Sequence, residues 1–153
     1  MDGWSEGEWL TLQLGPVWVI SALVGRNRFD ALEQAAFWQG VDDAPQESPL
    51  GWQLMRAMTR NREWLLDEFT LDERSIVSGL NEVASLLERV SPEVSRDARE
   101  FMLRVGMALA RARGPFGQRM SDQDALTLQL VAQLLETTKE TAENNPLNAA
   151  VAI

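Results

Sequence analysis

The chain has 153 residues, a formal net charge of −9, and no Cys, His or Tyr. This length fits one domain with its own core, and the missing Cys and His exclude disulfides, zinc–thiolate sites and catalytic triads with a histidine base. The acidic balance disfavours nucleic acid and anionic membrane surfaces as partners, because both are bound through cationic side chains.

The N-terminal region predicts two helices. Ser5 and Glu8 form a capping box that opens a short first helix, and Gly15-Pro16 is expected to end it. Pro16 then suits the first position of a second helix over about 16–25, which is apolar nearly all round and belongs at the centre of a core. This apolar run is too short to span a bilayer, and the acidic N-terminus lacks the basic region of a signal peptide. We therefore expect a cytoplasmic protein without membrane insertion.

A third helix is predicted over residues 31–39. Asp30 and Glu33 have the spacing of a capping box, and Gly40 is a typical helix stop. Residues 41–48, rich in Asp, Pro, Glu and Ser, are expected to form a loop. The residues expected on the buried face of this helix are Leu32, Ala35 and Ala36, with Phe37 as a further candidate.

Four amphipathic stretches follow. The first covers about 49–68, with Asn61 as a possible bend. A capping box from Thr70 to Glu73 is expected to open the second. Ser91-Pro92 starts the third, and Ser121 caps the last. The apolar positions of the first stretch are Trp52, Met55, Met58, Trp64, Leu65 and Phe69, and those of the last are Ala125, Leu128, Leu130, Val131, Leu134 and Leu135.

No segment shows the alternation of a strand, so the predicted fold class is all-α: a single-domain helical bundle of about seven helices. The domain is expected to cover residues 1–140, with a flexible C-terminal tail over 141–153. Charge is uneven along the chain. Six arginines and two carboxylates lie between residues 96 and 119, whereas five carboxylates and one lysine lie between 121 and 153. Neighbouring helices that partly neutralise one another would explain this pattern.

Two segments of the sequence match each other. Residues 22–33 read ALVGRNRFDALE, and residues 108–124 repeat the pattern with a four-residue insertion at 115–118. Each has an apolar helix, a residue able to adopt positive φ (Asn27 or Gly114), a basic and an apolar residue, and then a helix cap followed three positions later by an acid. The pattern predicts two pseudo-symmetric helix–loop–helix repeats.

This layout resembles the TerB-like family, named for the tellurite-resistance protein TerB, over about residues 14–137. The resemblance implies an all-helical domain of about seven helices. In that family, acidic residues at the two loops have been linked to divalent-metal binding. The matching acidic positions here are Asp30, Glu33 and Asp124, whereas Arg26 and Arg113 stand where the family has a loop Asp.

The acidic residues of the two loops have two interpretations. Capping explains them fully, because a cap oxygen accepts backbone N–H groups and a nearby acid favours a helix N-terminus. The alternative is a weak divalent-cation site at Asp30, Glu33 and Asp124, although a carboxylate-only site needs several converging oxygens. Capping is the favoured interpretation, and no cofactor is expected beyond this cation.

Arginines also concentrate at the two loops. Arg26, Arg28, Arg113 and Arg119 would form one basic patch, able to bind an anion or an acidic partner, if pseudo-symmetry paired the loops. The simpler explanation is pairing with local acids, which is common and weak at surfaces. The candidate acids are Asp30, Asp122 and Asp124.

All six tryptophans lie in the first half of the chain. Helical spacing favours core positions for Trp18, Trp52 and Trp64. The rings less easily buried, which would line an interaction surface, are Trp4, Trp9, Phe37 and Trp38.

The sequence therefore favours a non-enzymatic cytoplasmic helical domain that binds a protein partner or forms a homodimer. A divalent-metal-binding or tellurite/stress-response protein that uses the loop acids is the alternative. A carboxylate-dependent enzyme is a third and weaker one, because Asp and Glu alone need a defined pocket for acid–base work.

Overall fold

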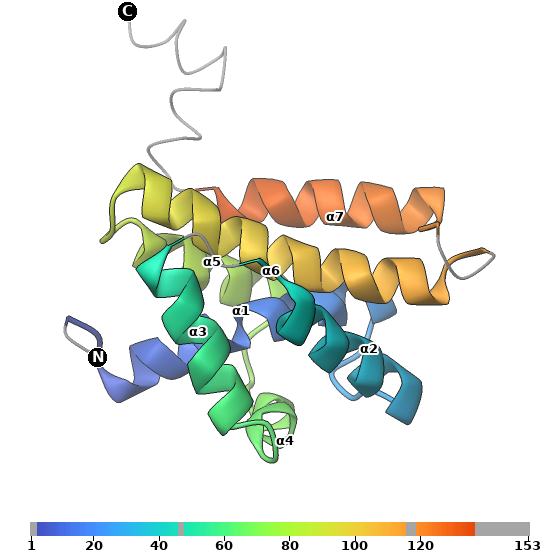
Figure 1. The fold of residues 1–153 in the computed structure, drawn as a ribbon, viewed down its shortest axis with the longest axis horizontal. Helices are drawn as coiled ribbons and strands as arrows, with labels where there is room; N and C mark the ends of the chain where they lie inside the picture. Colours follow the sequence, from blue (N-terminus) through green and yellow to red (C-terminus); the bar gives the residue numbers. More distant parts are fainter. Residues whose placement is uncertain (1–2, 46–47, 116–118, 137–153) are drawn as a thin grey trace, which may run out of the picture.

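The computed structural model describes residues 3–45, 48–115 and 119–136, which form seven α-helices and no strand (Figure 1). The all-α prediction is thus confirmed for this part of the chain, while the predicted tail at 141–153 and loop residues 116–118 lie outside it. None of the described helices has the length and apolar character needed to cross a membrane. The helices are α1 (Glu6–Val24), α2 (Ala31–Asp43), α3 (Pro49–Arg60), α4 (Leu65–Thr70), α5 (Ile76–Leu87), α6 (Pro92–Arg113) and α7 (Asp122–Leu135).

Helix α1 is the centre of the bundle. Every residue from Thr11 to Ser21 is buried, because the other helices surround this apolar segment. Helices α3 to α7 all contact α1, and α2 packs mainly on α6. Helices α6 and α7 run side by side in opposite directions (Figure 1). The prediction of a buried apolar helix near the N-terminus is confirmed.

The predicted break at Gly15-Pro16 is wrong, because α1 continues through both residues. Pro16 has no N–H to donate, which costs the helix one hydrogen bond, but both residues are buried and held by packing on all sides. Gly15 is needed for close approach rather than for a turn. A Cβ at that position would lie 2.6 Å from Sδ of Met102 on α6.

Two other predicted boundaries are also wrong. Helix α2 does not stop at Gly40, which lies inside the contact with α6, where a Cβ would be 3.0 Å from Cβ of Ala108. The predicted box at Thr70 and Glu73 does not open α5. Instead the hydroxyl of Ser75 accepts a hydrogen bond from the Ser78 amide at 3.1 Å and caps that helix. The predicted bend at Asn61 is confirmed, since α3 ends there.

Several apolar side chains expected in the core are exposed. Helix α3 buries the stripe formed by Leu50, Leu54 and Met58, so Trp52 points away from it and is 50% exposed. Trp64 precedes α4 and is 44% exposed. Leu32 of α2 and Leu130 of α7, which were also expected in the core, lie on outer faces, as do Val77 of α5 and Leu126 of α7.

Replacement of Gly79 by Ala is expected to destabilise the fold by about 2 kcal/mol, because overpacking a tight core forces a shift of backbone or side chains. A Cβ at Gly79 on α5 would lie 2.1 Å from Cε2 of Trp18, which is itself packed edge-on against Phe69. Urea unfolding measures the loss. Gly7→Ala is the matched control, since a Cβ there meets nothing within 4 Å and stability should not fall. Equal effects of the two substitutions would contradict this packing.

Candidate functional site

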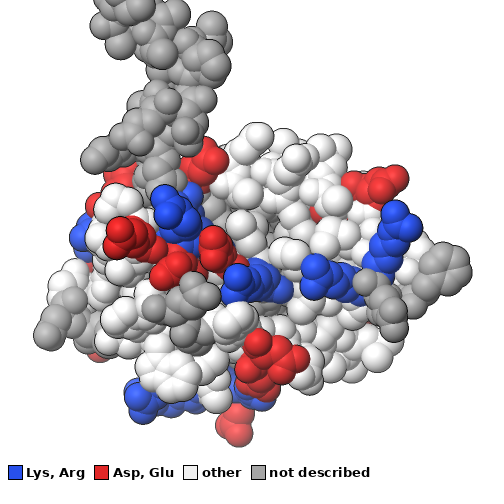
Figure 2. All heavy atoms as spheres, turned by 45° about the horizontal axis from the view of Figure 1, so that its top comes forward, with Lys and Arg blue, Asp and Glu red and all other residues white. Residues whose placement is uncertain are grey.

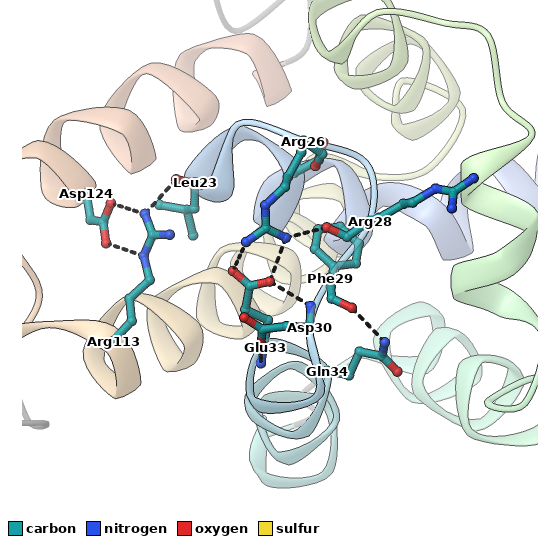
Figure 3. A network of polar contacts seen from close by, with 10 residues as sticks. Leu23, Arg26, Arg28, Phe29, Asp30, Glu33, Gln34, Arg113 and Asp124 are labelled. Atoms are coloured by element: carbon teal, nitrogen blue, oxygen red, sulfur yellow. Dashed lines mark hydrogen bonds and ion pairs between the residues drawn. The ribbon is translucent and has the colours of Figure 1, made fainter.

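The loop between α1 and α2 is closed by an arginine–glutamate pair. Arg26 follows the end of α1, where Gly25 adopts a left-handed conformation (φ 77°) that few other residues tolerate. The guanidinium of Arg26 donates two hydrogen bonds to the two carboxylate oxygens of Glu33, both at 2.7 Å (Figure 3). Glu33 also belongs to the predicted capping box with Asp30, in which each residue's side chain accepts the other's backbone N–H at 2.8 Å. That box is confirmed.

The start of α7 is held in the same way. Arg113, at the end of α6, donates to both carboxylate oxygens of Asp124, at 3.0 and 2.7 Å. Its Nη2 also donates to the carbonyl of Leu23 at 2.6 Å, which ties the end of α1 to this pair (Figure 3). Ser121 caps α7 by accepting the Asp124 amide at 3.1 Å, as predicted. Gly114, expected at positive φ, has φ −76° instead.

The two arginine–carboxylate pairs share one design. In each, an arginine at the end of one helix donates hydrogen bonds to the carboxylate at the third position of the next helix. The intervals from arginine to acid are 7 and 11 residues, and the difference matches the four-residue insertion between the two matching segments of the sequence. The spacing of an arginine before each cap is therefore a signal in the sequence that capping patterns alone do not reveal.

Electrostatics reinforces both pairs. The hydrogen-bonded guanidinium of Arg26 holds the pKa of Glu33 below its usual range, against the opposing effect of burial, and the charge of Arg113 lowers it further. Hydrogen bonding to Asp124 raises the pKa of Arg113, and Glu33 adds to this. The two pairs are thus close enough to act on each other.

The candidate metal ligands are already occupied by these contacts. Both oxygens of Glu33 and of Asp124 accept from guanidinium groups, and Asp30 caps α2. Within the described ranges, no group of three or more acidic side chains is gathered in a way that could hold a metal ion. A divalent cation would have to displace an arginine to reach either carboxylate.

The predicted basic patch is divided between paired and exposed arginines. Arg26 and Arg113 are engaged with carboxylates, whereas Arg28 and Arg119 are exposed. The alternative of pairing with local acids is confirmed for Arg113 and Asp124. For Arg26 the partner is Glu33 rather than Asp30.

The four rings of the predicted interaction surface are at least partly covered. Phe37 is fully buried and packs edge-on against Trp38, so its assignment to an exposed surface is wrong. The alternative prediction, which placed Phe37 on the buried face of α2, is confirmed, whereas Leu32 and Ala35, expected on the same face, are exposed. Trp4, Trp9 and Trp38 are half-buried against the core.

Arginines cover two of these three half-buried rings. The guanidinium of Arg89 lies 5.4 Å from the ring centre of Trp4, and that of Arg62 lies 4.7 Å from the ring centre of Trp38. Each guanidinium group therefore covers part of the face of its ring and forms a cation–π contact with it. These rings are therefore less available for a partner than the sequence pattern suggested.

A shallow polar depression of about 550 Å³ lies beside the Arg113–Asp124 pair. It is lined by the last turn of α1 and by Ser121, Gln123 and Thr127. The hydroxyl of Ser121 accepts a helix-capping hydrogen bond, and Asp124 is held by Arg113. The groups around the depression are arranged as a structural clamp between helices rather than as an acid–base pair.

The outer face of α7 is uncharged, and Figure 2 shows a broad white area in the upper part of the molecule, where α7 lies in Figure 1. No charged residue occurs from Ala125 to Leu135, and Leu126 and Leu130, one turn apart, are 56% and 52% exposed. The opposite side of α7 is buried against the bundle, and its buried residues are Asp124, Leu128, Val131 and Leu135. Helical spacing had placed Leu130 in the core and given no role to Leu126, although the uncharged run is visible in the sequence.

Comparison of the chain with protein-family models, with curated proteins and with solved structures found no match.

Arg113→Met is expected to lower the free energy of unfolding by about 2 kcal/mol, because it leaves the buried carboxylate of Asp124 without its partner. The effect should stay below the roughly 3–5 kcal/mol of fully buried pairs, since Arg113 is partly exposed. Arg28→Met, which changes an exposed arginine of the neighbouring loop, should cost less than about 0.5 kcal/mol. Denaturant titration compares the two, and equal losses would contradict a structural role for the Arg113–Asp124 pair.

Glu33 should make the free energy of unfolding depend on pH. Its folded-state pKa lies below its unfolded-state value, so the stabilisation is complete above the unfolded pKa of about 4.3 and is lost as pH falls through the folded pKa. Glu33→Gln should therefore be destabilising at pH 7, and its deficit relative to the unmodified chain should shrink in acid. Urea unfolding at several pH values measures this. Exposed Glu63→Gln is the control, and a deficit of Glu33→Gln that does not vary with pH would contradict the prediction.

Proposed function

We propose that this chain is a non-enzymatic helical interaction domain that binds a protein surface through the outer face of α7. The observation that carries the proposal is the exposure of Leu126 and Leu130 on a helix face without charge. Exposed leucine surface costs free energy in water, about 25 cal/mol per Å², and contiguous apolar surface of soluble proteins commonly serves association. A neutral face also avoids the desolvation of charges on binding.

The TerB-like resemblance and the two-repeat arrangement form part of this proposal. Their support is the shared design of the Arg26–Glu33 and Arg113–Asp124 pairs, each at a loop between two helices. In this interpretation the loop residues serve the architecture, since arginine has taken the place of a loop carboxylate. Divalent-metal binding is the weaker candidate, because the acids it needs are held by arginine.

Site-specific photocrosslinking in the native cell tests the proposal. Leu126 is replaced by the photoreactive amino acid p-benzoylphenylalanine, and Gln53, exposed on α3, receives the same replacement as the control. We expect discrete covalent protein adducts from position 126 that position 53 does not give. Identical background adducts from both positions would overturn the assignment of function to this face.

A further inference from the structure

The ridge of α6 beside α7 carries a charge gradient. Its outward charged positions are three, four or seven residues apart and therefore share one side of the helix. From the N-terminal end to the C-terminal end its acidic residues are Glu93, Asp97 and Glu100 and its basic residues are Arg104 and Arg111, while exposed Arg96 adds one basic group to the acidic end. The net charge of the ridge thus changes from negative to positive along its length. Its one internal ion pair, between Glu100 and Arg104, is long at 3.8 Å and exposed, so these charges remain accessible to a partner.

Groups at the two ends of α7 extend this gradient. Because α7 runs opposite to α6, Glu136 at its end lies towards the acidic end of the ridge. Exposed Arg119 before the start of α7 lies towards the basic end, which also holds exposed Asp122. Figure 2 shows most acidic spheres at the left of this face, with some basic spheres among them, and basic spheres running to the right below the uncharged surface, with one acidic group at the upper right. We call the ridge of α6 together with the outer side of α7 the α6–α7 face.

We propose that a second copy of this chain covers the α6–α7 face, packed antiparallel about a two-fold axis; this inference rests on the proposed function of α7. Rotation about such an axis sets the basic end of one copy against the acidic end of the other. It also sets the neutral stripe with Leu126 and Leu130 against itself. Two copies with a net charge of −9 each repel, so they can approach closely only where the surface is neutral or complementary in charge, and this face is both.

The dimensions of the α6–α7 face also fit a dimer. A 22-residue helix such as α6 is about 33 Å long, and two helices packed about 10 Å apart present a face about 20 Å wide. That area, roughly 600 Å², approaches the roughly 800 Å² per partner of a specific interface. We therefore expect a reversible dimer that weakens with salt, because complementary charges at its ends are exposed to screening.

Charge reversal at opposite ends of the face tests the arrangement. One variant carries Arg104→Glu and Arg111→Glu, and the other carries Glu93→Arg and Asp97→Arg. Light scattering and sedimentation at low salt measure mass, with circular dichroism to check folding. We expect the unmodified chain to dimerise, each variant alone to weaken the dimer at least about tenfold, and an equimolar mixture of the two to restore it. Leu130→Glu should abolish the dimer, whereas Leu32→Glu, 84% exposed on α2, should not change it.

Each other outcome overturns the proposal. A chain that stays monomeric at high concentration has no self-association. A dimer that survives both charge reversals uses another surface. A mixture that stays monomeric contradicts the antiparallel match. If the chain is monomeric while position 126 still crosslinks to a different protein, the second-copy inference fails and the proposed function stands. If position 126 gives only background, the proposed function itself fails.

Discussion

A helix with no polar face must be covered on every side, and α1 imposes this requirement on the rest of the chain. Its central residues can contribute to stability only if five other helices surround them closely. Close approach is achieved by glycines. Gly79 leaves room for Trp18, Gly106 for Val19, and Gly15 for Met102. Each of these positions would clash with a Cβ, so the same small residues that weaken a helix locally allow the bundle to pack.

The buried polar groups of α1 are satisfied by neighbouring elements. Asn61 donates to the Gln13 side chain at 2.7 Å, and this contact coincides with the break between α3 and α4. The guanidinium of Arg74 donates to the Thr11 hydroxyl at 3.2 Å while it stacks on Trp18. The elements around α1 thus provide hydrogen-bond partners for its buried polar side chains as well as apolar contacts, as buried polar groups require.

The packing of helices around α1 also gives the loops after α1 and α6 a structural role. The chain leaves α1 and α6 at neighbouring corners of the bundle, and an arginine at each corner fixes the helix that follows. The carboxylates that a metal site would need are thereby used in structure. The surfaces that we propose for binding, the uncharged side of α7 and the charged ridge of α6, lie on the outside of the bundle.

Local chemistry in the sequence predicted much of this fold. The caps at Ser5, Asp30, Ser91 and Ser121 depend on residues three positions apart, and all four were recognisable and are confirmed. What failed depended on contacts between distant residues. Gly15-Pro16 and Gly40 are typical signals of a helix end, but the helices continue through them, and Gly15 and Gly40 lie in close contacts with α6 that the sequence does not reveal.

Aromatic and apolar residues were the least predictable part of the fold. Trp52 and Met58 both have helical spacing, but the neighbours of α3 decide which face is covered. The candidate site was also only partly predictable from local sequence. The acids at Glu33 and Asp124 were identified as helix-start acids, but Arg26 and Arg113 reach them from the ends of the preceding helices. Their pairing could not be read from capping patterns alone.

Native-state amide hydrogen exchange is the most direct test of the central role of α1. If the bundle forms around this helix, the amides from Val17 to Leu23 should exchange only through global unfolding, with a free energy equal to that from denaturant unfolding. Exchange of these amides through local opening, at a free energy well below the global value while another helix stays protected, would contradict that central role.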